Sequence, residues 1–165
     1  MTASIRHLER GFTLVEAITV IVLSGVVTIG LLGFYLNSQA TWMDGSSQAL
    51  TQREATLLIE SIADRVHEAA SYDILPTSPP SGNQMVLLRD KDGNEMSRFS
   101  WEPVDSLVHY WDAGVDKGPV TTSVVERFQL AVVSASVVQL TGLQVRAADG
   151  ARITSSSMFA LNNAP

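Results

Sequence analysis

The sequence predicts an α+β protein, in which a long N-terminal helix packs on a C-terminal antiparallel β-sheet. Two observations lead to this fold class. No charged residue lies between Glu16 and Asp44, whereas the rest of the chain has the polar composition of a globular domain. After Gln84 the hydrophobic pattern changes from helical spacing to short apolar runs bounded by turn residues. With 165 residues, the chain can form one modest domain and one additional element.

The uncharged run from Ala17 to Met43 predicts a membrane-spanning helix. It is longer than the roughly 20 apolar residues that cross the hydrocarbon core of a bilayer. Arg6 and Arg10 precede the run, and Asp44 begins its far side. Because Lys and Arg are enriched on the cytoplasmic side of membrane helices, we expect a cytoplasmic N-terminus and a domain outside the cytoplasm.

Two common kinds of membrane leader leave part of this segment unexplained. A secretory signal peptide has a shorter apolar core and ends at a small-residue cleavage site, which does not close this run cleanly. A plain signal anchor fits both the length and the charge bias. Neither explains Glu16, because an ionisable residue at the start of a membrane span is costly and usually functional.

The residues around Glu16 resemble the N-terminal signature of type IV pilins and type II secretion pseudopilins. The stretch RGFTLVEAITVIVL combines a basic leader, Gly, Phe, Thr-Leu-Val-Glu and an apolar helix at fixed spacing. The resemblance implies that a prepilin peptidase cuts between Gly11 and Phe12 and then N-methylates Phe12. It also implies that Glu16 pairs with the terminal amine of a neighbouring subunit in an assembled filament.

Simple electrostatics agrees with this implied pairing. Cleavage before Phe12 would create an amine, with an ordinary pKa of about 8, one helical turn before Glu16. A buried carboxylate needs a positive partner, and a free subunit in the bilayer has no neighbour to supply one. The pair would therefore favour docking between subunits. The alternative is a carboxylate that reaches the lipid headgroups or interacts with the N-terminus of its own helix.

The resemblance also divides the chain into four segments. These are a leader (1–11), a membrane and assembly helix (12–43), a periplasmic half of the helix (44–75) and a globular antiparallel β domain (76–165). It implies a single-pass protein of the bacterial inner membrane or a filament. The implied partners are prepilin peptidase, other pilins or pseudopilins, the assembly platform and, before assembly, membrane lipid. Length and strand rhythm resemble J-type minor pseudopilins and W-type minor pilins, which implies a minor subunit.

Helical spacing resumes beyond the membrane segment. An apolar stripe, which we expect to pack on the sheet, contains Ala55, Leu58, Ile62, Val66 and Ala69. The helix is expected to end before Pro76, where the loop PTSPPSGN begins. The following runs predict a hairpin around KDGNE, a third strand in SLVHYWDAG, and three antiparallel strands in the remaining C-terminal part.

The composition argues against several other functions. The net charge of −6 and the lack of clustered Lys and Arg argue against nucleic acid binding. The chain has no cysteine, which excludes thiolate catalysis and zinc–thiolate sites. The stretch Asp90–Glu95 fails the EF-hand pattern, because Trp101 occupies the twelfth position. His67 and His109 are isolated in sequence, and neither a nucleophile elbow nor a P-loop occurs.

We therefore expect a structural subunit rather than an enzyme, with neither a metal site nor a cofactor. Energy for assembly would have to come from another protein, because the sequence has no nucleotide-binding loop. The alternative is a bitopic inner-membrane protein that has a plain anchor and a periplasmic binding or enzymatic domain.

Overall fold

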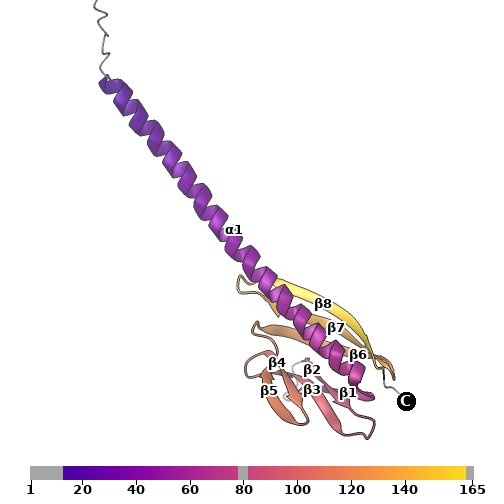
Figure 1. The fold of residues 1–165 in the computed structure, drawn as a ribbon. Coiled ribbons are helices and arrows are strands. Elements are labelled where there is room, and N and C mark those ends of the chain that lie inside the picture. The colour runs from indigo at the N-terminus through magenta and orange to yellow at the C-terminus, as the bar shows by residue number, and fades with distance from the viewer. Residues whose placement is uncertain (1–12, 78–81, 163–165) are drawn as a thin grey trace, which may run out of the picture. The chain divides into compact units, whose positions relative to one another are not determined.

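The computed structural model describes residues 13–77 and 82–162, which form one helix and eight strands (Figure 1). The chain divides into two compact units, residues 1–43 and residues 44–165. Helix α1, Leu14–Glu68, contributes to both units. Within the described ranges, it is the one helix long and apolar enough to cross a membrane. The predicted α+β class, with a long N-terminal helix packed on antiparallel strands, is confirmed.

The strands belong to the second unit and form two antiparallel sheets. Sheet A has the order β1-β2-β3-β4-β5 and consists of β1 (Ser71–Pro76), β2 (Gln84–Arg89), β3 (Glu95–Glu102), β4 (Leu107–Asp112) and β5 (Val115–Pro119). Sheet B has the order β6-β7-β8 and consists of β6 (Val125–Ser134), β7 (Val137–Arg146) and β8 (Arg152–Ala160). Consecutive strands are neighbours in both sheets, so that short turns can join most of them.

The turn between β2 and β3 shows why the KDGNE stretch forms a hairpin. The Asp90 carboxylate accepts hydrogen bonds from the backbone N–H groups of Asp92 and Asn94, both at 2.9 Å. Gly93 has a φ of 82°, a left-handed conformation that glycine adopts without a Cβ clash. The predicted hairpin is confirmed, and the Asp90 carboxylate makes these hydrogen bonds within the turn.

The helix ends earlier than its sequence pattern indicates. It stops at Glu68, and residues 71–76, which we expected to extend the helical half to residue 75, form β1 instead. The backbone N–H of Ala70 donates a 2.9 Å hydrogen bond to the carbonyl of Arg89, at the point where the β1–β2 ladder begins. Pairing with β2 therefore decides the conformation of a segment whose local pattern fits either state.

Strand β5 is a second element that the sequence analysis missed. Residues Val115–Pro119 contain one large apolar side chain, a glycine and a proline, and thus lack the alternation that predicts a strand. They pair with β4 at the edge of sheet A. An edge strand tolerates proline because one of its sides needs no ladder hydrogen bond.

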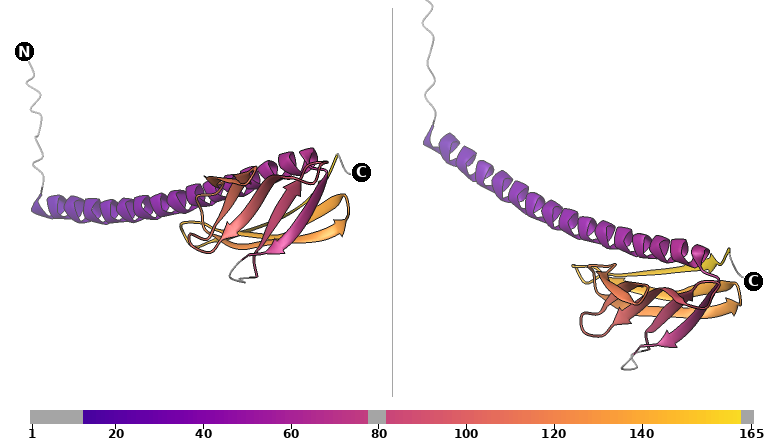
Figure 2. Two further views of the ribbon diagram at one scale, coloured as in Figure 1. Left: turned by 90° about the horizontal axis from the view of Figure 1, so that it is seen from below. Right: turned by 60° about the horizontal axis from the view of Figure 1, so that its bottom comes forward.

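The core of the second unit lies between the helix and both sheets. The predicted stripe is confirmed as buried, because Leu58, Ile62, Val66 and Ala69 are completely buried and Ala55 nearly so. These side chains share one cluster with residues from both sheets, including Phe99 of β3 and Phe128 of β6. The part of α1 beyond Asp44 lies along one side of the two sheets (Figure 2).

Side-chain amides at the start of β2 and just before it accept hydrogen bonds from the outer edge of β6. The side-chain oxygen of Asn83 accepts from the backbone N–H of Phe128 at 2.7 Å, and that of Gln84 accepts from Leu130 N–H at 2.5 Å. Buried backbone N–H groups need acceptors, and an edge strand has no neighbouring strand to supply them. Side-chain amides thus replace the missing strand on this edge.

Candidate functional site

Glu16 lies in the first turn of α1 and is exposed. Its backbone N–H donates to the Thr13 hydroxyl oxygen at 3.3 Å, and this hydroxyl lies 3.5 Å from the Glu16 carboxylate. Thr13 precedes the helix directly, so the pair has the T-x-x-E spacing of a helix capping box. The sequence analysis did not identify Thr13, although that spacing was visible in the sequence.

This contact bears on the two roles considered for Glu16. The carboxylate does interact with the N-terminus of its own helix, as the alternative reading expected. However, its only hydrogen-bond partner among the described residues is Thr13, at the long limit of such a bond. The exposed carboxylate can therefore still accept a cationic partner. Its pairing with a neighbour's amine stays a prediction.

The other predicted site residues lie outside the described residues. Arg6, Arg10, Gly11 and Phe12 all fall within residues 1–12. The leader charge, the cleavage site and the N-methylation site therefore stay predictions from the sequence motif.

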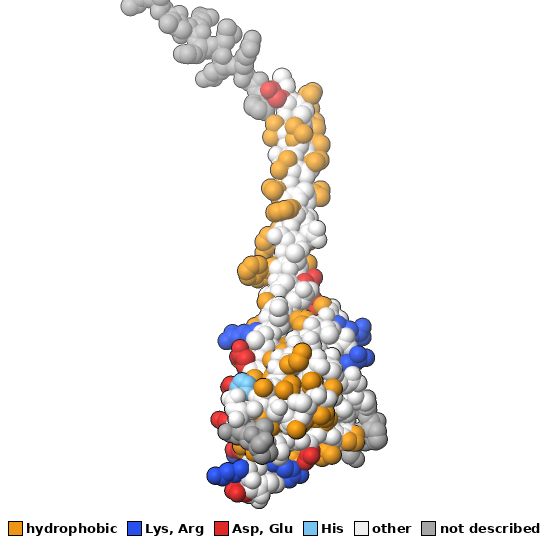
Figure 3. All heavy atoms as spheres, turned by 90° about the vertical axis from the view of Figure 1, so that its right-hand side faces the viewer, with side chains coloured by type: hydrophobic (Ala, Val, Ile, Leu, Met, Phe, Trp, Pro, Cys, Tyr) orange, Lys and Arg blue, Asp and Glu red, His pale blue; other side chains and the backbone are white. Residues whose placement is uncertain are grey.

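The helix of the first unit presents an apolar surface on all sides. Hydrophobic side chains, orange in Figure 3, are spaced along its length on the face that the view shows. The exposed large residues include Val15, Ile18, Val22, Val26, Ile29, Leu32, Phe34 and Leu36. A surface of this size exposed by a soluble protein would be a strong aggregation hazard, so it requires lipid or other helices as its surroundings.

Threonine hydroxyls within this helix find acceptors in the helix itself. The hydroxyl of Thr19 donates to the carbonyl of Val15 at 2.8 Å, and that of Thr28 donates to the carbonyl of Ser24 at 2.7 Å. Such i→i−4 bonds remove the penalty of placing a hydroxyl in a hydrocarbon environment. The three glycines at 25, 30 and 33 leave open space where a side chain would lie, which permits close approach of another helix.

The second unit contains a surface groove of about 450 Å³ beside the end of the helix. It is lined by Ser61, Asp64, Arg65, Glu68, Phe99, Tyr110 and Val120. The Arg65 guanidinium lies 5.5 Å from the centre of the Tyr110 ring and 3.0 Å from the Glu68 carboxylate. This arrangement joins the last helical turn to β4.

Glu54 connects the helix to the segment before β6. Its carboxylate accepts hydrogen bonds from the backbone N–H groups of Ser123, at 2.9 Å, and Thr122, at 3.3 Å, and from the Thr122 hydroxyl. Partial burial acts to raise the pKa of Glu54, but these hydrogen bonds outweigh it and hold the pKa below its usual value. The sequence pattern did not predict this contact, because Glu54 and its partners Thr122 and Ser123 are far apart along the chain.

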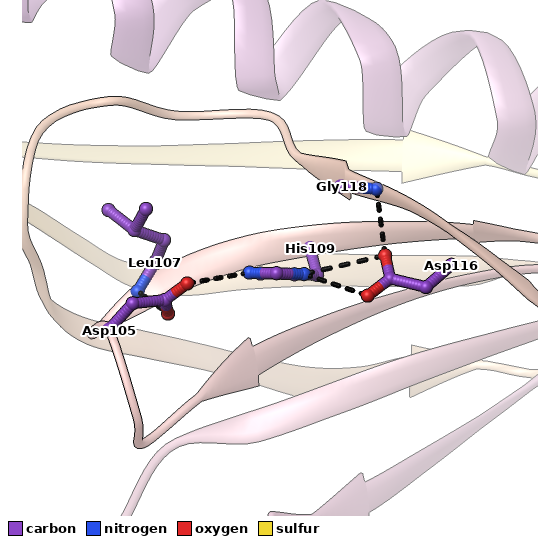
Figure 4. A network of polar contacts seen from close by, with 5 residues as sticks. All are labelled: Asp105, Leu107, His109, Asp116 and Gly118. Atoms are coloured by element: carbon purple, nitrogen blue, oxygen red, sulfur yellow. Dashed lines mark hydrogen bonds and ion pairs between the residues drawn. The ribbon is translucent and has the colours of Figure 1, made fainter.

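His109 lies between two carboxylates, although it is isolated in sequence. Its Nε2 is 2.8 Å from Asp105 Oδ2, and its Nδ1 is 3.1 Å from Asp116 Oδ2 (Figure 4). His67, in contrast, is exposed in the last turn of α1. Across the parts of the chain that the structure describes, no group of three His, Cys, Asp or Glu side chains is arranged to hold a metal ion.

Comparison with known proteins concerns the N-terminal segment alone. The family model of the prokaryotic N-terminal methylation motif matches residues 6–32, which include Glu16 and the four site residues predicted before it, Arg6, Arg10, Gly11 and Phe12. Neither a curated protein nor a solved structure matches the chain.

Proposed function

We propose that this type IV pilin-like precursor, of the kind that prepilin peptidase processes, is a minor subunit of a type IV pilus or a type II secretion pseudopilus. The methylation motif over residues 6–32 carries the proposal. The motif includes the start of helix α1, which begins at Leu14 and continues to Glu68, first with an apolar surface and then with one face buried against a globular domain. These features suit a subunit that is first inserted in the membrane and is then incorporated into a filament.

Cleavage and methylation prepare the end of the helix for assembly. Removal of residues 1–11 would leave Phe12 as the first residue, one turn before Glu16. The carboxylate of Glu16 has a single weak partner, the Thr13 hydroxyl, among the described residues. An amine from a neighbouring subunit would offer a charge-assisted hydrogen bond, which is about twice as strong as a neutral one. Docking of a neighbour would then complete the pair.

The remaining surface of the helix supports the same role. Before assembly, its exposed apolar side chains contact membrane lipid. After assembly, they pack against neighbouring helices. We infer that the arginines before the motif keep the leader in the cytoplasm and that the domain beyond Asp44 faces the periplasm. An inner-membrane assembly platform would supply the energy for extraction of the subunit.

A recruitment experiment with two variants tests the proposal. The chain is expressed with prepilin peptidase and its partner pilins, and the filament fraction is isolated. We expect wild-type protein in that fraction, shortened by residues 1–11 and carrying one added methyl group by intact mass. Glu16→Ala should be processed and folded but poorly recruited, because breaking a buried ion pair costs about 3–5 kcal/mol.

Thr13→Val is the matched control, because it removes the local partner of Glu16 and keeps the carboxylate. We expect it to be recruited, at a loss of only about 1 kcal/mol in helix capping. Wild-type recruitment of Glu16→Ala would refute the pairing role, unless crosslinks from Phe12 show that no neighbour lies beyond it at the filament tip. An unprocessed wild-type chain would instead favour the plain-anchor alternative.

A further inference from the structure

The contacts of His109 require a particular charge state. Both of its ring nitrogens face carboxylate oxygens, Asp105 Oδ2 at 2.8 Å and Asp116 Oδ2 at 3.1 Å. An ionised carboxylate only accepts hydrogen bonds, whereas a neutral imidazole has one N–H group to donate. Only the imidazolium form can therefore satisfy both contacts at once.

Neither carboxylate can turn away easily. Asp105 also accepts a 3.0 Å hydrogen bond from the backbone N–H of Leu107, and Asp116 accepts one of 2.8 Å from Gly118 (Figure 4). The His109 side chain is only 15% exposed, which limits how far water can replace a lost contact. Loss of the proton would therefore leave one ring nitrogen facing a fixed carboxylate with no hydrogen between them.

The turn that carries Asp105 also joins the two sheets. It lies between β3 and β4, and Ser106 within it has a φ of 60°, an unfavourable conformation for a serine. The carbonyl of Ser106 accepts a 2.8 Å hydrogen bond from the N–H of Val125, the first residue of β6. The carbonyl of Val125 in turn accepts a 2.7 Å bond from the Trp101 indole. The strained turn thus connects sheet A to sheet B.

We propose that His109 is a pH-dependent latch: its imidazolium holds the β3–β4 turn against β5, and loss of its proton loosens the turn that joins the two sheets. The latch has two parts that move apart when it opens. One is the turn with Asp105 and Ser106, and the other is the β5 segment with Asp116. The latch is a property of the globular domain, and it does not depend on the proposed function.

The two carboxylates beside the His109 ring both favour its protonated form. Burial alone would lower the pKa of His109, but Asp105 from the turn and Asp116 from β5 outweigh it and raise the pKa above its usual value. The backbone hydrogen bond from Gly118 is the main cause that holds the pKa of Asp116 low, and His109 and then Arg98 of β3 add to it. The residues opposite His109 in the neighbouring strands, Ser100 and Pro119, carry no charge.

The sign of the pH effect follows from the raised pKa. A group that binds its proton more tightly in the folded state stabilises that state fully below its unfolded pKa, about 6.5 for histidine. The stabilisation is lost as the pH rises through the higher, folded pKa. The latch is therefore closed below the unfolded pKa and opens as the pH rises through the higher, folded pKa.

Two measurements on the full-length chain in detergent micelles test the latch. Histidine labelled with ¹³C in the ring gives signals for the three histidines of the chain, which His67→Gln and His109→Gln assign. Titration from about pH 5 to about pH 9 then gives the pKa of His109 directly. Amide hydrogen exchange at the same pH values follows the β3–β4 turn, β5 and the start of β6.

Exchange rates are compared with those of His109→Gln at each pH, which removes the intrinsic effect of pH on exchange. We expect His109 to titrate above about 6.5, and the protection that wild type has over the variant to disappear across that titration. Each unit of raised pKa corresponds to about a tenfold difference in protection. His67→Gln should leave exchange in these segments unchanged.

Asp105→Asn provides a second route, should His109→Gln fail to fold. A carboxamide oxygen can still accept from Nε2, but it carries no charge, so this variant should lower the pKa of His109 and weaken the pH dependence of exchange in the turn. A His109 pKa at or below its ordinary value would overturn the proposal. Protection of the turn that does not change across the His109 titration would overturn it as well.

Discussion

The indole nitrogen of Trp101 in sheet A donates a 2.7 Å hydrogen bond to the carbonyl oxygen of Val125 in sheet B. Both residues are buried in the common core, where water cannot replace a lost partner. The same peptide segment of β6 donates its N–H to Ser106, so each side of Val125 is tied to sheet A. The relative placement of the two sheets therefore depends on polar contacts as well as on apolar packing.

Trp101→Phe should destabilise the domain, because it keeps an aromatic ring but leaves the Val125 carbonyl without its indole donor. An unpaired buried acceptor costs about 1–3 kcal/mol, and the lost ring volume adds to it. Urea unfolding of the full chain in detergent, followed by circular dichroism, would measure the change. Trp42→Phe is the control, because Trp42 is 77% exposed and should change the free energy of unfolding by less than about 0.5 kcal/mol. Equal effects of the two substitutions would contradict this role of Trp101.

Glu54→Gln should weaken the contact between the helix and the Thr122–Ser123 segment at neutral pH. We expect a loss of about 1 kcal/mol in the free energy of unfolding, below the range of about 1.5–3 kcal/mol for hydrogen bonds to a charged group, because the site is partly exposed. Since the folded pKa of Glu54 is lowered, its stabilisation is present above the unfolded pKa of about 4.3 and is lost as the pH falls through the folded value.

Unfolding measured at neutral and at acidic pH would show whether wild type and Glu54→Gln converge in acid. Glu60→Gln serves as the control, because Glu60 is exposed on the same helix. A difference between wild type and Glu54→Gln that persisted unchanged in acid would mean that the charge of Glu54 does not strengthen the contact.

Gly11→Leu should leave the leader attached. The proposed scissile bond follows this residue, and a peptidase at the membrane surface needs a small side chain beside the bond that it cuts. Intact mass after coexpression with prepilin peptidase would show the full-length chain, whereas Ala3→Leu, within the leader but away from the bond, should still be cleaved. Efficient cleavage of Gly11→Leu would place the processing site elsewhere.

The direction in which the chain crosses the membrane can be read with reporters fused after Pro165. A reporter that works only outside the cytoplasm should be active, and one that works only inside should be silent. Replacing both Arg6 and Arg10 with Glu should reduce this asymmetry, because these charges set the orientation. An active cytoplasmic reporter on the wild-type chain would show the opposite topology.

The parts of the fold that local periodicity determines were predicted from the sequence. The stripe of Leu58, Ile62 and Val66 repeats with the period of the helix, and the runs beyond Gln84 alternate like strands. Strand β1 was missed because its conformation is decided by pairing with β2, and the contacts of the Asn83 and Gln84 side chains with the edge of β6 join residues far apart in the sequence.

The surroundings of His109 could not be predicted for a related reason. Asp116 reaches the ring from β5, and the pairing of β4 with β5 shifts register between Tyr110 and Trp111. A register shift of one residue changes which side chains lie on the same face of the sheet, and the local sequence pattern does not predict such a shift. In contrast, the capping contact between Thr13 and Glu16 is local, and the T-x-x-E spacing could have revealed it.

The bonds that Thr19 and Thr28 make to carbonyls of their own helix would have a consequence for the proposed extraction from the bilayer. Because donor and acceptor belong to the same helix, these bonds travel with it, and none must break when lipid is exchanged for protein. Lipid tails are about as apolar as the leucine side chains of a neighbouring helix, so the exchange of surroundings is nearly balanced for most of the surface. The free-energy difference between lipid and neighbouring helices then depends on the few groups that interact differently with the two. The carboxylate of Glu16 is the one charged side chain that α1 carries before Asp44.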